Sequence, residues 1–203
     1  MDDTDNLEWH QQRCGKITAS RMSHVLAKGH GITRARYCAQ LAAERMTGRP
    51  HRSNFKSTSM EHGNEFEAMA RIQYELRNGV MVEGTGKEFT PHLIITAGAS
   101  CDGMVNDDGL VEFKCPDTHT FIEYKLSEEI PRQYQLQMMW QLACTGRQWC
   151  DFVAFDPDLD ERDGYLQIRF TPTPQHIADL ETEVIKFDAE VEQLIELILG
   201  KRK

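Results

Sequence analysis

Residues 100–114 contain the runs Ser100-Cys101-Asp102-Gly103-Met104 and Leu110-Val111-Glu112-Phe113-Lys114. The second run predicts a strand, because its apolar residues favour extended backbone and Gly103 and Gly109 bracket a turn before it. Alternate strand residues face opposite sides of a sheet, so Glu112 and Lys114 share one face while Phe113 points into the core. A preceding strand over 93–97 and a hairpin would bring Asp102 beside Glu112.

Two carboxylates and an ammonium group on one small patch indicate a functional site. A hard divalent cation held by the carboxylates is the simplest use of such a patch, and it would activate water for attack on a phosphodiester. The alternative is ordinary pairing, since an acid two residues before a lysine is common on a solvated strand face. The apolar neighbours of Glu112 favour the catalytic interpretation, because a buried strand rarely carries two charges on the same face.

The composition predicts a single domain over residues 1–203. The chain has 40% hydrophobic and 27% charged residues, as is usual for a soluble globular protein, and no apolar run approaches the length of a membrane span. The start of the sequence is acidic and polar, so no signal peptide is expected. Six cysteines occur without a Cys-x-x-Cys pair. This usage predicts reduced thiols in a cytoplasm and gives no support for a zinc site.

Charge is distributed unevenly along the chain. The net charge is −9, yet residues 1–60 carry ten Lys or Arg against five acids, whereas 61–203 carry thirteen against twenty-seven. Such asymmetry predicts either a basic DNA-binding face on an acidic body or merely the solvated face of an early helix.

The hydrophobic pattern predicts an α/β fold in which helices flank a central mixed β-sheet. We expect helices over 17–27, 33–47, 60–77, 131–145 and a long C-terminal one over 175–199. We expect strands near 80–82, 93–97, 110–114, 151–155 and 165–170, and a basic loop over 51–58. The exposed face of the last helix is acidic, which indicates solvation or a surface for self-association.

A third acid lies in the helix predicted over 60–77. Its run Gly63-Asn64-Glu65-Phe66-Glu67 lets only one glutamate face the sheet, and the neighbouring apolar residues favour Glu67. Glu67 would then help to hold a cation or a water molecule at the acidic patch, although the residue by itself also suits an exposed helix position.

Five motifs together resemble the YqaJ and lambda-exonuclease family of phage recombination nucleases, which includes alkaline exonucleases. They occur in the order of that family and span residues 9–157. The motifs are Trp9–Ser20, Gly63–Glu67, Ser100–Gly103 with Glu112–Pro116, Tyr134–Gln137 with Thr145-Gly146, and Asp156-Pro157.

The resemblance implies a restriction-endonuclease-like fold with a PD-(D/E)xK core. It further implies a Mg²⁺-dependent 5′-to-3′ exonuclease that degrades one strand of double-stranded DNA from its ends. The products would be 5′-mononucleotides and 3′ single-stranded overhangs for recombination by strand annealing. Family members of the lambda type form homotrimeric rings and act with a single-strand-annealing protein in a bacterial cytoplasm. Two Mg²⁺ ions are expected, and Mn²⁺ is a possible substitute.

The resemblance also implies roles for individual residues. Asp102 and Glu112 correspond to metal ligands together with the carbonyl of Phe113, Glu67 to the helix acid, and Lys114 to the lysine that handles the attacking water. We expect neighbouring metal ions and burial together to lower the pKa of Lys114. Gln137 corresponds to the active-site glutamine of the family, with Tyr134 as its neighbour. Arg13, Ser20 and Ser100 match positions that bind the terminal 5′-phosphate. Trp9 would lie beside the DNA or in the core, and Met60 would lie at the terminal base pair.

Other functions remain open at this level. The same fold serves endonucleases and junction resolvases, and an inactive patch would leave a DNA-end-binding recombination adaptor. Arg13 could likewise form an ordinary surface salt bridge with Glu8. The polarity of Gln137 and Tyr134 also suits any helix face.

Overall fold

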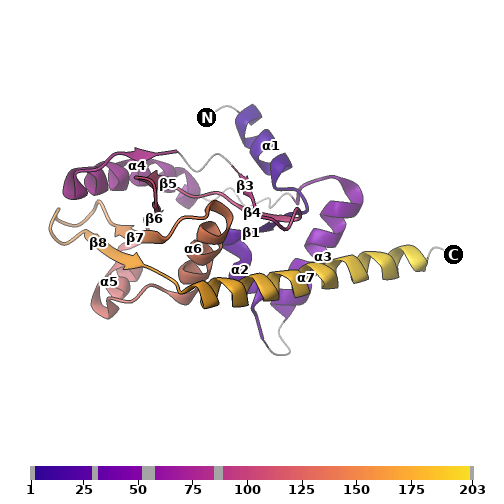
Figure 1. The fold of residues 1–203 in the computed structure, drawn as a ribbon. Coiled ribbons are helices and arrows are strands. Elements are labelled where there is room, and N and C mark those ends of the chain that lie inside the picture. Colours follow the sequence, from indigo (N-terminus) through magenta and orange to yellow (C-terminus); the bar gives the residue numbers. More distant parts are fainter. Residues whose placement is uncertain (1–2, 29–31, 52–57, 85–88, 202–203) are drawn as a thin grey trace.

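The computed structural model describes residues 3–28, 32–51, 58–84 and 89–201, and for 3–7 and 58–65 it describes only the backbone (Figure 1). Two mixed sheets are flanked by helices, so the predicted fold class is confirmed. The helices are α1 (Asp3–Gln12), 3-10 helix η1 (Ala19–Arg21), α2 (Met22–Val25), α3 (Ile32–Thr47), α4 (Thr58–Asn78), α5 (Thr118–Ser127), α6 (Arg132–Thr145) and α7 (Pro174–Gly200). The strands are β1 (Ile17–Thr18), β2 (Val82–Glu83), β3 (Thr90–Pro91), β4 (Ala97–Ala99), β5 (Gly103–Val105), β6 (Gly109–Lys114), β7 (Trp149–Phe155) and β8 (Tyr165–Phe170).

The larger sheet has the strand order β2-β5-β6-β7-β8, and β6 and β7 at its centre run parallel. The smaller sheet has the order β1-β4-β3, in which β1 and β4 are parallel. The chain passes from the smaller sheet to the larger one between β4 and β5, where Asp102 lies. The expectation of one central sheet therefore becomes two sheets joined at the acidic patch.

Several predicted elements differ from the structure. The helix expected over 17–27 begins instead as β1 and becomes helical only at Ala19, because Ile17 and Thr18 pair with β4. The strand expected over 93–97 is a turn up to Thr96, followed by β4. Helices α1 and α5 and strands β3 and β5 were not expected. The middle of the loop predicted over 51–58 lies outside the described residues.

Strand β6 separates two hydrophobic clusters by simple alternation. Val111 and Phe113 pack toward α4, whereas Leu110 packs toward α5 and α6. Glu112 and Lys114 therefore project to the α6 side of the sheet, at the end where β6 and β7 finish. This alternation confirms that Phe113 points into the core, where it is buried.

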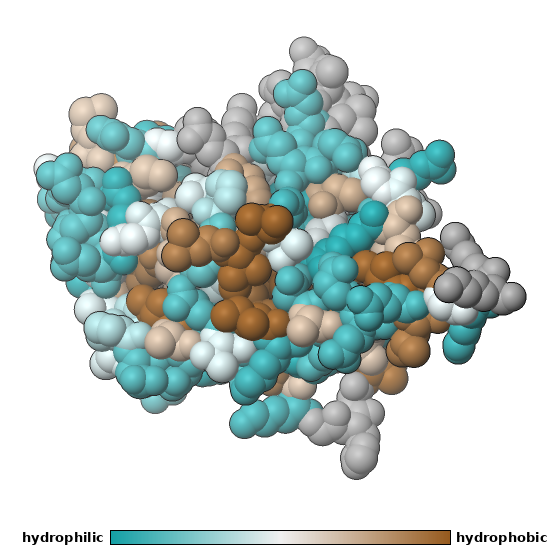
Figure 2. Space-filling model, turned by 45° about the vertical axis from the view of Figure 1, so that its right-hand side comes forward, coloured by the Kyte–Doolittle hydropathy of each residue, from teal (hydrophilic) through white to brown (hydrophobic). Residues whose placement is uncertain are grey.

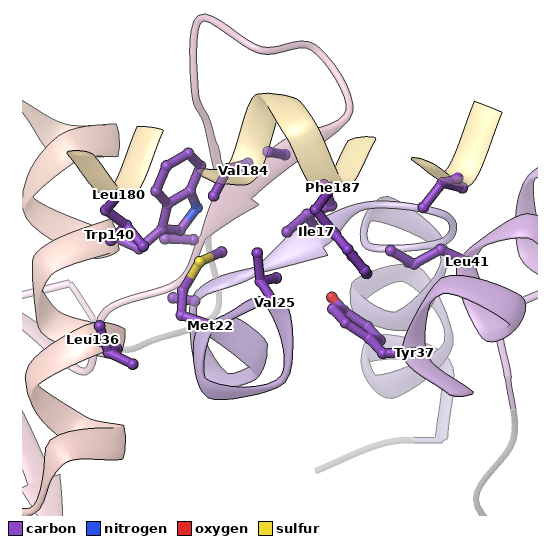
Figure 3. Packing of buried hydrophobic residues seen from close by; sticks show 14 of the residues in the cluster. Ile17, Met22, Val25, Tyr37, Leu41, Leu136, Trp140, Leu180, Val184 and Phe187 are labelled. Atoms are coloured by element: carbon purple, nitrogen blue, oxygen red, sulfur yellow. The ribbon is translucent and has the colours of Figure 1, made fainter. Parts of the chain in front are cut away.

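A third cluster joins the smaller sheet to the helices around it. Trp140 of α6, Phe187 of α7 and Tyr37 of α3 converge on Ile17 and Met22 (Figure 3). The indole of Trp140 also donates to the carbonyl oxygen of Gly98 in β4, at 3.2 Å. The cluster anchors α6 against β1 and β4, and so sets the position of the helix that faces Glu112.

Helix α7 crosses the molecule and extends beyond α3 (Figure 1). Hydrophobic surface gathers at its C-terminal end (Figure 2), where Leu197, Ile198 and Leu199 are exposed. Among the described residues, no helix is long and apolar enough to cross a membrane.

Candidate active site

The predicted acidic patch forms where the two sheets meet. Asp102 lies just before β5, and its Oδ2 atom accepts a hydrogen bond from the backbone N–H of Phe113 at 2.8 Å. This bond holds Asp102 beside the end of β6, as the hairpin between β5 and β6 predicts. Asp102 and Glu112 are close enough for the charge of Glu112 to affect the pKa of Asp102.

Glu112 is fully buried and is the most heavily hydrogen-bonded acid of the patch. Its Oε1 atom accepts from Lys114 Nζ and from Gln137 Nε2. Its Oε2 atom accepts from Gln141 Nε2 at 2.7 Å. Glu112, Lys114 and Gln137 were predicted to come together, and the structure brings them into direct contact.

Gln141 was not identified from the sequence. It is fully buried, and its Nε2 atom also donates to the carbonyl oxygen of Ser100 at 2.9 Å. Its position four residues after Gln137 places both amides on one face of α6. That spacing, read against a buried acid, is the signal that could have identified Gln141.

The pKa values of Asp102 and Lys114 are both raised, but for different reasons. Burial, followed by the charge of Glu112, raises the pKa of Asp102 from 3.8 to about 8. For Lys114, burial by itself lowers the pKa, but the carboxylates of Glu112 and Asp102 outweigh it and the net pKa is raised. Without metal, two acids face a single ammonium group and the pKa of Lys114 is raised; a lowering beside bound metal stays a prediction.

Two further residues predicted for the site lie around Lys114. Burial raises the pKa of Glu67 in α4, while Lys114 lowers it and Glu112 raises it, so Glu67 lies within electrostatic reach of both. The ring of Tyr134 lies with its centroid 5.3 Å from Lys114 Nζ. It stacks on Phe152 with 5.5 Å between ring centroids. Tyr134 thus forms an aromatic wall beside the lysine.

The donor set suits a hard cation that keeps part of its water shell. Two crowded carboxylates, Asp102 and Glu112, and the nearby backbone carbonyl of Phe113 are the kind of oxygen ligands that magnesium prefers. In the part of the chain that the structure describes, no three His, Cys, Asp or Glu side chains gather closely enough to hold one ion. Magnesium keeps several water ligands in proteins, so two carboxylates and one carbonyl fit it, with water completing the shell.

A second candidate site is a cavity of about 210 Å³ between α1, β1 and α3. Its basic lining comprises Arg13, Arg21, Lys16 and the histidines 10 and 51, and Ser20 and Trp9 also line it. Asp102, Glu112 and Lys114 do not line this cavity.

Arg13 is a half-buried cation in this cavity. Its guanidinium lies 4.0 Å from the centroid of Trp9, and no described carboxylate forms a salt bridge with it, so the alternative of a pair with Glu8 is not found. Burial lowers its pKa to about 10, with Tyr37 raising it and Arg21 lowering it. Glu44 also lines the cavity, but its carboxylate accepts from Gly15 and Gln40. A cation that forms no salt bridge with a described residue and faces a cavity is well suited to bind an anion.

The chain that follows Arg13 is held in place by residues of α3. Glu44 Oε2 accepts from the N–H of Gly15 at 2.7 Å, and Arg45 Nε donates to the Gly15 carbonyl at 2.9 Å. Gly15 has φ +69°, and a Cβ atom there would lie 2.8 Å from Arg45 Cγ. This position therefore requires glycine.

The smaller sheet connects the cavity to the acidic patch. Because β1 and β4 run parallel with Thr18 opposite Gly98, the segments that carry Ser20 and Ser100 leave the sheet at the same edge. The hydroxyl of Ser100 is buried and has no hydrogen-bond partner among the described residues, as is often seen where a ligand or water completes a site. The side chain of Met60 lies outside the described residues.

Comparisons with known proteins agree with this geometry. A model of the YqaJ-like viral recombinase domain matches residues 8–148. The chain is similar to the crystal structure of an alkaline exonuclease (LHK-Exo) from Laribacter hongkongensis, with 40% identity, a TM-score of 0.87, and coverage of 96% of this chain and 97% of that one. LHK-Exo in complex with dAMP gives 41% identity, a TM-score of 0.88 and the same coverage.

Two other results bear on the fold and on sequence similarity. A phage-related exonuclease from Haemophilus somnus 129PT shares the fold, with 16% identity, a TM-score of 0.68, and coverage of 90% of this chain and 96% of that one. A search of curated proteins gave no match.

Proposed function

We propose, from the premise that this chain belongs to the YqaJ-like viral recombinase family, that it is a DNA exonuclease that requires Mg²⁺. It would degrade one strand of a double-stranded end from 5′ to 3′, release 5′-mononucleotides and leave a 3′ overhang for strand annealing. The observation that carries this proposal is the contact of buried Glu112 with Lys114, beside Asp102, at the edge where the two sheets meet.

The metal would be held by Asp102, Glu112 and the carbonyl of Phe113, as one ion or as a pair. When bound, magnesium supplies positive charge to the phosphodiester and makes water more acidic. Mn²⁺ offers the same kind of chemistry to oxygen ligands. Glu67, which lies within electrostatic reach of Lys114, would orient a water molecule at this site.

The chain's own residues would then arrange the reactants. Lys114 Nζ would donate to the attacking water or to a phosphate oxygen, and would take up the water's proton if it has first lost its own. Gln137 would hold Glu112 through Oε1, and Tyr134 would shield Lys114 from bulk water. Exclusion of water strengthens each of these electrostatic contacts.

The basic cavity supports the 5′-to-3′ direction. A terminal phosphate carries more negative charge than an internal one. Arg13 faces the cavity and forms no salt bridge with a described residue, so it would favour ends. Ser20 and Ser100 would add hydroxyl donors at the edge shared with the acidic patch. Trp9 holds the guanidinium of Arg13 by its ring, and so supports the pocket from within.

Assembly would extend the contact with DNA. We propose a homotrimeric ring around the duplex and a single-strand-annealing protein as partner, acting in a bacterial cytoplasm. The exposed apolar residues at the end of α7 support association with another chain, since such surface is commonly covered. Light scattering on the purified protein tests the ring, and a monomeric mass would contradict it.

The decisive experiment uses linear duplex DNA labelled separately at each 5′ end and each 3′ end. With Mg²⁺ or Mn²⁺, the 5′ label should appear first as a mononucleotide, and with EDTA no label should be released. Circular plasmid should remain intact, whereas an endonuclease or a resolvase would cut it. Binding to ends without any nucleotide release would favour an adaptor.

A further inference from the structure

We infer that Gln141 is a positioning residue that sets the spacing between the two acidic segments of the site. This inference rests on the proposed metal centre. The buried amide donates at once to Glu112 Oε2, at 2.7 Å, and to the Ser100 carbonyl, at 2.9 Å. Glu112 belongs to the larger sheet, and Ser100 lies between the smaller sheet and Asp102. One amide therefore links the two chain segments that carry the proposed acidic metal ligands.

The orientation of the amide is determined by its neighbours. Both N–H groups of Gln141 are used, and each meets an acceptor oxygen that cannot donate. A flipped amide would place Oε1 against the Glu112 carboxylate and the Ser100 carbonyl, which is repulsive. In the observed orientation Oε1 is buried without a partner among the described residues. The structure thus tolerates one unsatisfied oxygen in order to keep both donors in place.

Gln137 and Gln141 each donate a hydrogen bond to a different oxygen of the Glu112 carboxylate. Gln137 and Lys114 contact Oε1, whereas Gln141 is the described side chain that contacts Oε2. An ionised carboxylate has about four acceptor positions, so Glu112 can still bind a cation while Gln141 remains bound. Partners that orient a metal ligand in this way typically change metal affinity by roughly 10- to 100-fold when they are removed.

A filling role in the core is the competing explanation. Gln141 is fully buried in α6, and methionine would fill a similar volume without any hydrogen bond. If packing is the whole role, Gln141→Met should bind metal as the parent does. If positioning is the role, the variant stays folded and loses metal affinity.

The test is titration of the full-length protein with Mn²⁺ alone, without DNA, with the free ion followed by electron paramagnetic resonance. We expect Gln141→Met to weaken Mn²⁺ binding roughly 10- to 100-fold. DNA binding in EDTA should stay unchanged, and the Mg²⁺ concentration for half-maximal nuclease activity should rise. Gln135→Met is the matched control, because Gln135 lies on the same helix and donates to the Ile130 carbonyl instead.

The outcomes separate the two proposals. No Mn²⁺ binding by the parent protein would remove the metal centre itself and this inference with it. Equal binding by parent and Gln141→Met would overturn only the positioning role. If the methionine variant does not fold, Gln141→Asn keeps an amide that is too short to reach both acceptors. We expect the same loss of affinity for it, and unchanged affinity would refute the inference.

Discussion

Oδ2 of Asp102 accepts a hydrogen bond from the backbone N–H of Phe113. Phe113 stands between Glu112 and Lys114 in β6, so this bond joins the first acid of the patch to the strand that carries the other two charges. The bond uses the backbone rather than a side chain, and therefore the patch depends on the position of β6 itself.

Replacing Lys114 by alanine should abolish cleavage and retain DNA binding. The ammonium group contacts Glu112 inside the patch and is absent from the basic cavity. A positioned proton-transfer group typically contributes about 10²- to 10⁴-fold in rate, and we expect a loss in that range. Digestion of linear duplex measures it, with Lys125→Ala on α5 as the control. Cleavage by Lys114→Ala at the parent rate would show that the assigned role is wrong.

Replacing Arg13 by alanine should remove the preference for 5′-phosphorylated over 5′-hydroxyl ends. The reason is that its guanidinium faces the cavity and forms no salt bridge with a described residue. The ratio of initial rates on the two substrates is the measurement. Arg36→Ala is a suitable control, because Arg36 is an exposed arginine of α3. An unaltered ratio in the Arg13 variant would eliminate the phosphate pocket.

The contribution of Asp102 to the stability of the protein in EDTA should fall as the pH rises from about 4 to about 8. The pKa of Asp102 is raised from 3.8 to about 8 in the folded state, so the folded protein binds a proton that the unfolded chain has already released. This contribution is present at low pH and is lost as the pH passes through the folded value. Asp102→Asn should lack this part of the pH dependence. Melting curves at several pH values check it, and parallel profiles for parent and variant would contradict it.

Mg²⁺ should raise the melting temperature of the parent protein. An ion that binds only the folded state adds about 2.7 kcal/mol at one hundred times its dissociation constant. Asp102→Asn should show little of this gain at alkaline pH, since it lacks one proposed ligand. Melting curves with Mg²⁺ and with EDTA give the difference. A gain that is equal in both proteins would locate the binding elsewhere.

Two arginines that bind α7 should differ in their effect on stability. Arg45 has 12% exposure and donates to Asp188, Glu192 and the Gly15 carbonyl. Arg34 pairs with Glu190 at 23% exposure. We expect Arg45→Ala to cost about 2 kcal/mol, as for lost bonds to charged groups, and Arg34→Ala below about 1 kcal/mol. Urea unfolding measures the free energy of unfolding of both variants. Equal losses would show that burial of the arginine does not determine the size of its contribution.

The elements read most accurately from sequence are those with strong local signals. Helix α6 ends at Gly146, which has the left-handed conformation expected of a helix-terminating glycine. The alternation in β6 correctly assigned Phe113 to the core and Glu112 with Lys114 to the other face. Helix α5 also has a readable signal that was missed, since Asp117 caps it by accepting from the N–H of Thr120.

The errors arose where distant partners decide the structure. Ile17 and Thr18 have a pattern compatible with the following helix, but they form a strand because β4, some eighty residues later, offers its edge. The raised pKa of Lys114 without metal depends on Asp102 as well as on Glu112, and their combined charge exceeds the effect of burial.

The order of residues along the chain by itself determined which side chains share a face of β6, where the principal helices lie, and which family the protein joins. These properties follow from local backbone geometry and from motifs that are read in order. Only the tertiary structure decided that Gln141 meets Glu112 and Ser100, that Arg13 lies over the ring of Trp9 in a cavity, and that two sheets meet at Asp102. Each of these features depends on contacts between residues that are far apart in sequence. Such contacts form, and contribute to stability, only when the chain has folded.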